Sequence, residues 1–272
     1  MLTDPATSAH HVRRASLVAY MILTVAAVGP YLNTGRTIRF LDSLTLESIP
    51  GASNASLALR SLLQTAFHPG QELATLTFAL NYKLNTILGY GGFDAPCYIV
   101  VNIALHVVNV WLLYALLQEL IRVTKPNQPV SPLLPLAITI LYAVHPIHVT
   151  TVLDVVQRRS LLAGLFQTTG LLAYLRCRDS RKSEHRLAWA AVTALMFWLC
   201  MKSRSTGLAM PLVLLSLEFV MQLASRSKIR HFLAWGGAAL VVCTLAMLAF
   251  MWRSGLFDPG TLTFHSPQTM NA

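Results

Sequence analysis

Seven apolar stretches recur along the chain, separated by more polar segments. They cover residues 15–31, 97–118, 132–145, 160–175, 187–201, 207–224 and 232–252. A helix of about 20 apolar residues crosses the hydrocarbon core of a bilayer, and the first and last stretches carry no charged residue. The third to fifth are shorter, so either their ends lie beside a water-filled cavity or the helices extend a few residues further. The pattern predicts an all-α integral membrane protein with seven transmembrane helices.

The loop that follows the first stretch, residues 32–95, has a pattern of its own. Apolar residues recur at helical spacing in 54–67 and again in 72–88. Lys83 and Asn81 interrupt the second segment, and a charge or an amide is costly in the hydrocarbon core. We therefore predict two helices that lie at the outer membrane interface rather than crossing it.

Composition supports a membrane protein. Hydrophobic residues make up 54% of the chain and charged residues 12%, whereas soluble domains carry about 25% charged residues. The net charge of +10 would suggest a nucleic-acid partner in a soluble protein. Here the basic residues flank apolar stretches, where lipid headgroups lie, so no nucleic-acid partner is predicted. The four cysteines have no spacing typical of a metal site or a disulfide framework.

The distribution of basic residues predicts the orientation. With the N-terminus inside, the short inner segments carry 12 of the 21 Lys and Arg residues, against five in the short outer segments. Cytoplasmic loops are enriched in these residues. We therefore expect a cytoplasmic N-terminus (1–14), a membrane core (15–252) that includes the outer loop, and an outer C-terminal tail (253–272).

The short outer loop between the third and fourth stretches reads "HPIHVTTVLDVVQRR". His145 and His148 flank a proline at a predicted helix end. As a metal pair they have no carboxylate nearby except Asp154, so we predict no metal site here. The alternative is a structural corner or a contact with a lipid headgroup.

Basic side chains from three outer segments are predicted to meet at one membrane surface. These residues are Arg39, Arg158, Arg159, Lys202 and Arg204. Guanidinium groups bind phosphate oxygens well, often in pairs of parallel hydrogen bonds. Two interpretations stay open: the five residues anchor the protein at the interface, or they bind the phosphate of a lipid.

A polar stripe crosses the second apolar stretch. Asn102, His106 and Asn109 lie at helical positions i, i+4 and i+7, and so on one face. Polar side chains inside a membrane most often hydrogen-bond to neighbouring helices. We predict this role for the stripe.

The order of these motifs resembles that of the GT-C membrane glycosyltransferases, especially the branch related to the tetratricopeptide-repeat O-mannosyltransferases and their bacterial relatives. The matching segments are "LTFALNY" (76–82), "APCYIVVNIALHVVNVWLLYALL" (95–117), "HPIHVTTVLDVVQRRSLLAGLF" (145–166) and "SRSTGLAMPLVLLSLE" (203–218). The resemblance implies the N-terminal core of the GT-C fold. It also implies sugar transfer from a polyprenyl carrier at the outer face, with the carboxylate of Asp42 as base or metal partner and a divalent metal as cofactor if the protein is active.

The departures from the family pattern mostly concern carboxylates. The first-loop signature of two adjacent acids is reduced to one in Phe40-Leu41-Asp42. Two glutamates of the family are replaced by Thr150 and Ser205, and Gln71-Glu72 stands where relatives often carry Arg-Pro. Basic residues are retained, and Arg159 is additional. Arginine stays protonated and offers no lone pair, so it does not replace a catalytic base.

These departures predict a degenerate GT-C core: a pseudoenzyme that serves as a structural or accessory subunit of a membrane complex and retains lipid-phosphate binding. Its expected partners are a protein of that complex and a membrane lipid, either a polyprenyl phosphate or a phospholipid. Two alternatives stay open: an active polyprenyl-phosphate-sugar-dependent transferase that uses Asp42, and a non-catalytic lipid-phosphate binding protein. The resemblance implies the bacterial inner membrane, with a periplasmic C-terminus.

Overall fold

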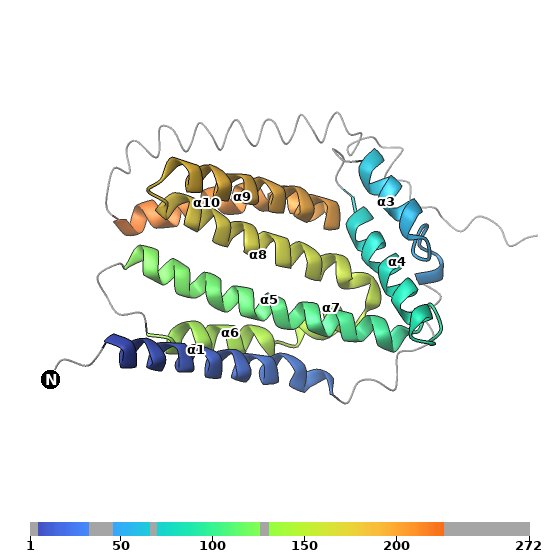
Figure 1. Ribbon diagram of the computed structural model, residues 1–272, viewed down its shortest axis with the longest axis horizontal. Helices are drawn as coiled ribbons and strands as arrows, with labels where there is room; N and C mark the ends of the chain where they lie inside the picture. The colour runs from blue at the N-terminus through green and yellow to red at the C-terminus, as the bar shows by residue number, and fades with distance from the viewer. Residues whose placement is uncertain (1–4, 33–45, 66–69, 126–130, 226–272) are drawn as a thin grey trace, which may run out of the picture. The chain divides into compact units, whose positions relative to one another are not determined.

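The computed structural model describes residues 5–32, 46–65, 70–125 and 131–225, and this part of the chain is helical without strands (Figure 1). The elements are α1 (Pro5–Val28), η1 (Gly29–Tyr31), α3 (Ala55–Gln64), α4 (Glu72–Ile87), α5 (Ala95–Thr124), α6 (Leu133–Ala143), α7 (Ile147–Leu153), η2 (Val155–Gln157), α8 (Arg158–Asp179), α9 (Ser183–Ser203), η3 (Ser205–Ala209) and α10 (Met210–Ser225). The all-α prediction is confirmed for these residues.

The chain divides into two compact units, residues 1–207 and 208–272. In the first unit, α5 packs against α1, α6 and α8, and α8 packs in turn against α9. Helices α3 and α4 pair with each other and lie across one end of these longer helices (Figure 1). The second unit contributes α10 to the described residues.

Two hydrophobic clusters stabilise the first unit. One joins α1 to α5 through the fully buried Leu23 and Val110, with the Tyr20 ring edge-on to Tyr114. The other joins α4, α5 and η2 through Phe78, Tyr98 and Val155. Burial of each large apolar side chain contributes about 1.5–3 kcal/mol, so the second cluster holds α4 against the long helices.

Two described segments are long and apolar enough to cross a membrane, Ala95–Thr124 and Ser205–Gln222. A third qualifies if α6 and α7, which meet at a bend of 63°, form one broken span. These helices support a membrane protein. The seven-span arrangement stays a prediction, and its last member, 232–252, lies outside the described residues.

The polar stripe of α5 hydrogen-bonds to backbone carbonyls at and beside the break between α6 and α8. Asn102 Nδ2 donates to the carbonyls of Val152 (3.1 Å) and Asp154 (3.3 Å), and His106 Nε2 lies 3.3 Å from the Ala143 carbonyl. Asn109 Nδ2 binds the Leu161 carbonyl in the first turn of α8 at 3.0 Å. The predicted interhelical role is confirmed. Unpaired carbonyls in hydrocarbon would cost several kcal/mol each.

Helices α3 and α4 confirm the two helices predicted within 54–67 and 72–88. Asn54 caps α3, because its side-chain oxygen accepts from the backbone N–H groups of Ser56 and Leu57, both at 3.1 Å. Helix α3 buries Leu62 and exposes Leu63, as an amphipathic helix does. Their place at the membrane interface stays a prediction.

Candidate anion-binding site

The two arginines of "QRR" begin α8 because the chain turns sharply just before them. The Asp154 carboxylate caps η2 by accepting from the Val156 N–H at 3.0 Å. After this single 3₁₀ turn, Arg158 and Arg159 are the first two residues of α8. Consecutive positions on a helix lie about 100° apart around its axis, so the two side chains leave the helix in different directions.

Arg158 points into the protein. Its side chain is fully buried, and its guanidinium carbon lies 4.9 Å from the centre of the Phe78 ring and 5.2 Å from that of Tyr98. It donates four hydrogen bonds: Nε to Asn102 Oδ1 (2.9 Å), Nη1 to the Thr77 carbonyl (3.3 Å), and Nη2 to Asn81 Oδ1 (2.9 Å) and the Tyr98 carbonyl (3.0 Å).

All four acceptors of Arg158 are neutral oxygens, so its charge is stabilised by dipoles and aromatic faces rather than by a carboxylate. Arg158 lies just outside the apolar stretch 160–175 that is predicted to cross the membrane. Burial lowers the pKa of its guanidinium to about 10, which leaves it protonated at neutral pH. The prediction that Arg158 binds a lipid phosphate stays untested, but in this conformation its donors are engaged by the protein.

Arg159 and Arg204 face a common cavity of about 370 Å³. The lining residues are Gly70, Gln71, Arg159, Arg204 and Ser205. Small-molecule pockets commonly measure about 300–1,000 Å³. The structure thus brings together two of the five predicted basic residues, in a lining that holds two guanidinium groups and no carboxylate.

The two cavity arginines are held from different helices. Arg159 Nη1 donates to Gln71 Oε1 at 2.8 Å, while its Nε is buried without a hydrogen-bond partner among the described residues. Arg204 Nη1 donates to Ser160 Oγ, which itself donates to Gln157 Oε1 at 2.9 Å. The neutral contacts leave both positive charges uncompensated, so an anion would be attracted to the cavity.

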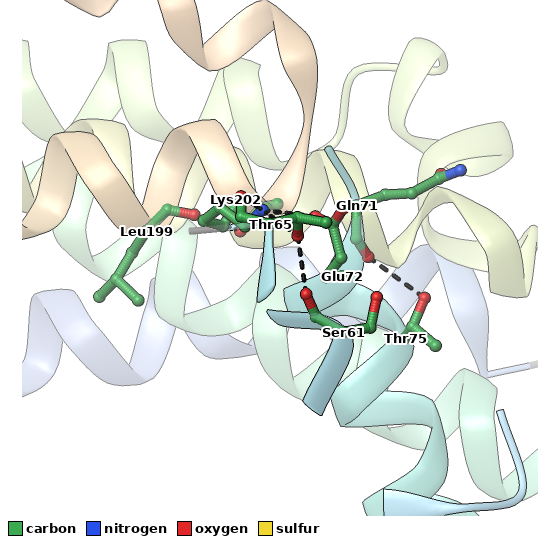
Figure 2. Close-up of polar contacts among 8 residues, drawn as sticks. Ser61, Thr65, Gln71, Glu72, Thr75, Leu199 and Lys202 are labelled. Carbon is green, nitrogen blue, oxygen red and sulfur yellow. Dashed lines mark hydrogen bonds and ion pairs between the residues drawn. The ribbon is translucent and has the colours of Figure 1, made fainter. Parts of the chain in front are cut away.

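Lys202 lies behind this cavity and has an acidic partner. Its side chain is fully buried, and Nζ lies 2.8 Å from Glu72 Oε2. Nζ also donates to Thr65 through the carbonyl oxygen (2.8 Å) and Oγ1 (3.0 Å), as Figure 2 shows. Sequence reasoning missed this pair: Glu72 stood out only as a departure from the family pattern, with nothing to connect it to Lys202.

Gly70 allows the turn before α4 to approach α9 closely. Its N–H donates to the Met201 carbonyl at 3.2 Å. A Cβ atom at this position would lie 2.2 Å from Glu72 Oε2, which the ion pair with Lys202 holds in place. A larger residue at position 70 would therefore displace the Glu72 carboxylate from its place beside Lys202.

His145 and His148 belong to an aromatic corner at the break between α6 and α7. The His148 ring lies 4.3 Å from that of Tyr142, 5.1 Å from that of His106 and 6.4 Å from that of His145, measured between ring centres. The described residues contain no group of three His, Cys, Asp or Glu side chains placed to hold a metal ion. Sequence reasoning did not foresee that His106 joins the corner.

The acidic half of the predicted site is not placed. Asp42 and Arg39 both lie outside the described residues, so the catalytic role expected for Asp42 in an active enzyme stays a prediction. Within the described residues, the positions where family members carry glutamate hold Thr150, which is exposed, and Ser205, which lines the cavity.

No family model matches the chain, and no solved structure matches it. Several curated proteins match part of the chain. The relatives are protein O-mannosyl-transferases by name. TMTC4 of Mus musculus is 37% identical over 109 residues, which is 38% of this chain and 14% of the relative. TMTC4 of Homo sapiens is 34% identical over 133 residues (47% and 16%), and a relative from Caenorhabditis elegans is 27% identical over 170 residues (58% and 23%).

These relatives support the resemblance to the O-mannosyltransferase branch, and with the apolar helices they support a glycosyltransferase-like membrane protein. The matched segments span less than a quarter of the relatives' length. The relatives come from animals, so the comparisons give no support to the bacterial inner membrane. The orientation of the two termini stays a prediction.

Proposed function

We propose that this chain is a glycosyltransferase-like accessory protein that binds the phosphate group of an anionic membrane lipid between Arg159 and Arg204. The observation that carries the proposal is the cavity of about 370 Å³ whose lining holds two guanidinium groups and no carboxylate. The proposal assigns direct contact to these two arginines. Lys202 and Arg158 support the walls, and Arg39 stays an additional candidate outside the described residues.

The charge balance around the cavity favours an anion. Glu72, the nearest carboxylate on the α4 turn, is paired with Lys202. The cavity therefore keeps the two charges of Arg159 and Arg204. The positive end of the α8 dipole adds to the attraction, since Arg159 lies in its first turn. Each charge-assisted hydrogen bond contributes about 1.5–3 kcal/mol.

An accessory role is supported by what surrounds the cavity. Proton transfer needs a carboxylate or imidazole within hydrogen-bond reach of the reacting group. In this cavity Ser205 stands where the family carries a glutamate, and the Glu72 carboxylate is held by Lys202. A divalent metal would likewise need oxygen ligands, and the described residues offer no such group of acidic and imidazole side chains. The accessory protein is expected to work beside a catalytic partner in the same membrane.

The active transferase is the second candidate, and the names of the curated relatives favour it. It would use Asp42 as base. Purified protein supplied with a polyprenyl-phosphate sugar and an acceptor peptide distinguishes the two. Sustained sugar transfer that disappears in Asp42→Asn supports the transferase. Absence of transfer from folded protein that still binds lipid supports the accessory role.

The lipid site is tested in nanodiscs of phosphatidylcholine that contain a small fraction of phosphatidic acid, by native mass spectrometry of the retained lipid. Arg159→Gln and Arg204→Gln should each weaken retention by about tenfold or more, and the double variant should lose it. Arg186→Gln, an exposed arginine at the start of α9, is the matched control and should bind as wild type. Equal retention by wild type and double variant would overturn the proposal.

A further inference from the structure

The buried guanidinium of Arg158 joins the first turn of α8 to two other helices. It donates hydrogen bonds to the Thr77 carbonyl and the Asn81 side chain of α4, and to the Tyr98 carbonyl and the Asn102 side chain of α5. These acceptors lie 56 to 81 positions away in the sequence. Arg158 is therefore a point at which three helices are fixed relative to one another.

The two asparagine acceptors of Arg158 are held in place by hydrogen bonds of their own. Asn81 Nδ2 donates to Asn85 Oδ1 at 3.0 Å, and Asn85 Nδ2 donates to the Gly92 carbonyl at 3.1 Å. Asn102 Nδ2 donates to two carbonyls at the end of α7. Because each amide NH₂ is used elsewhere, the oxygens of Asn81 and Asn102 are left to face Arg158. Only a planar fork of N–H donors matches this arrangement; a lysine ammonium is a compact point charge.

Both cavity arginines depend on the turn that Arg158 fixes. Arg159 is the next residue, and with Arg158 held towards α4 and α5, its own side chain reaches Gln71 and the cavity. Ser160 follows, and its hydroxyl accepts from Arg204. Arg158 itself does not line the cavity. A shift or rotation of this turn would move Arg159 itself and Ser160, the partner of Arg204, at once.

We propose that Arg158 is the positioning residue of the anion site: its buried guanidinium locks the first turn of α8 to α4 and α5, and so aims Arg159 at the cavity. This inference rests on the proposed function. It assigns anion contact to Arg159, the arginine that the family pattern lacks, and an architectural role to Arg158, the arginine that the pattern contains.

The test compares lysine substitutions at the two neighbouring positions, with phosphatidic acid in phosphatidylcholine nanodiscs as the probe. Arg159→Lys keeps a positive charge at the cavity and should lose about threefold in affinity or less, whereas Arg158→Lys should lose about tenfold, because geometry rather than charge is needed there. Near-ultraviolet circular dichroism and gel filtration confirm that each variant is folded at the temperature of measurement. Arg186→Lys is the matched control.

A double-mutant cycle separates positioning from a general loss of structure. If Arg158 acts mainly through Arg159, then Arg158→Lys should lose clearly less affinity in an Arg159→Gln background than in wild type, since only the contact of Ser160 with Arg204 then depends on the turn. Wild-type affinity in folded Arg158→Lys would overturn the inference. So would a loss that is equally large in both backgrounds, because Arg158 would then contact the anion itself or act on the whole fold. Inorganic phosphate, used as a second probe, shows whether the site needs a lipid or only a phosphate.

A second measurement needs no ligand and so distinguishes this inference from the proposed function. Phenylglyoxal modifies accessible arginines, and peptide mass spectrometry locates the modified ones. In folded wild-type protein, Arg159 and Arg204 should react while Arg158 stays protected, and Arg158→Lys should change the rate at Arg159 by roughly threefold or more if the α8 turn moves. If wild type binds neither probe but shows this pattern, the proposed function fails and the positioning role stands. Reaction of Arg158 at the rate of Arg159, or an unchanged rate at Arg159, would overturn the positioning role.

Discussion

The pair of Lys202 and Glu72 should be asymmetric: removal of the acid should destabilise the protein more than removal of the base. The Lys202 side chain is fully buried, whereas 20% of the Glu72 side chain is exposed. Glu72→Gln leaves a buried ammonium group that has lost its carboxylate and still donates to Thr65. Lys202→Met leaves a carboxylate whose side chain is partly exposed, although Oε2 itself is buried, and it fills much of the vacated volume with apolar atoms.

The magnitudes follow from the burial of each partner. Removing one partner of a fully buried ion pair costs about 3–5 kcal/mol. Glutamine retains an oxygen that can accept from Lys202 Nζ, and Thr65 still provides two acceptors, so we expect Glu72→Gln to cost about 2–3 kcal/mol. Lys202→Met should cost about 1 kcal/mol, since mainly the hydrogen bonds to Thr65 are lost. The double variant should cost less than the sum.

Thermal unfolding in detergent, followed by intrinsic fluorescence, measures these differences. For a chain of this size, 1 kcal/mol corresponds to a change in Tm of about 2–4 °C, so Glu72→Gln should lower Tm by about 4–12 °C and Lys202→Met by about 2–4 °C. Glu47→Gln, a change of an acid on the same loop, is a control for net charge. Equal losses in the two single variants, or a neutral Glu72→Gln, would show that burial does not decide the strength of this pair.

Two further predictions concern the helix break and the orientation. Asn102→Leu should lower the free energy of unfolding by about 2–4 kcal/mol, because the Val152 carbonyl and a donor of Arg158 lose a partner, while the Asp154 carbonyl keeps the Gln157 N–H. Asn109→Leu removes one hydrogen bond to a carbonyl within α8 and should lower it by about 1 kcal/mol, and equal unfolding curves for the two variants would contradict this account. A reporter fused after Ala272 should be active outside the cytoplasm and one inserted beside Lys182 inside it; the opposite pattern at both sites would contradict the predicted span count.

Much of the secondary structure follows from the chain's local pattern. The apolar stretches at 97–118 and 160–175 lie within α5 and α8, and Asn54 begins α3 as its capping side chain requires. The boundaries were less predictable: α8 runs from Arg158 to Asp179 because its polar ends continue the helix outside the apolar stretch. Hydrophobicity reports where a helix meets lipid, while backbone hydrogen bonds decide where it ends.

The polar stripe of α5 could also be predicted, because its spacing places three side chains on one helix face. Which carbonyls those side chains bind could not, since they belong to the ends of α6, α7 and α8. The position of the break in the chain depends on Pro146, but the partners that make the break tolerable come from a different helix. The local sequence thus predicted that these three side chains form hydrogen bonds, and the packing of the helices determined which carbonyls accept them.

The basic cluster shows most clearly what the sequence determined and what it left to the tertiary structure. Charge patterning along the chain determined that Arg158, Arg159, Lys202 and Arg204 belong to the same end of the helices. Only the fold separated them into a buried positioning arginine, an ion-paired lysine and two arginines at a cavity. The physical reason is that apolar patterning sets the depth of a residue along a helix. The direction of a side chain depends on its rotation about the helix axis, and the partners of these four residues lie 44 to 137 positions away.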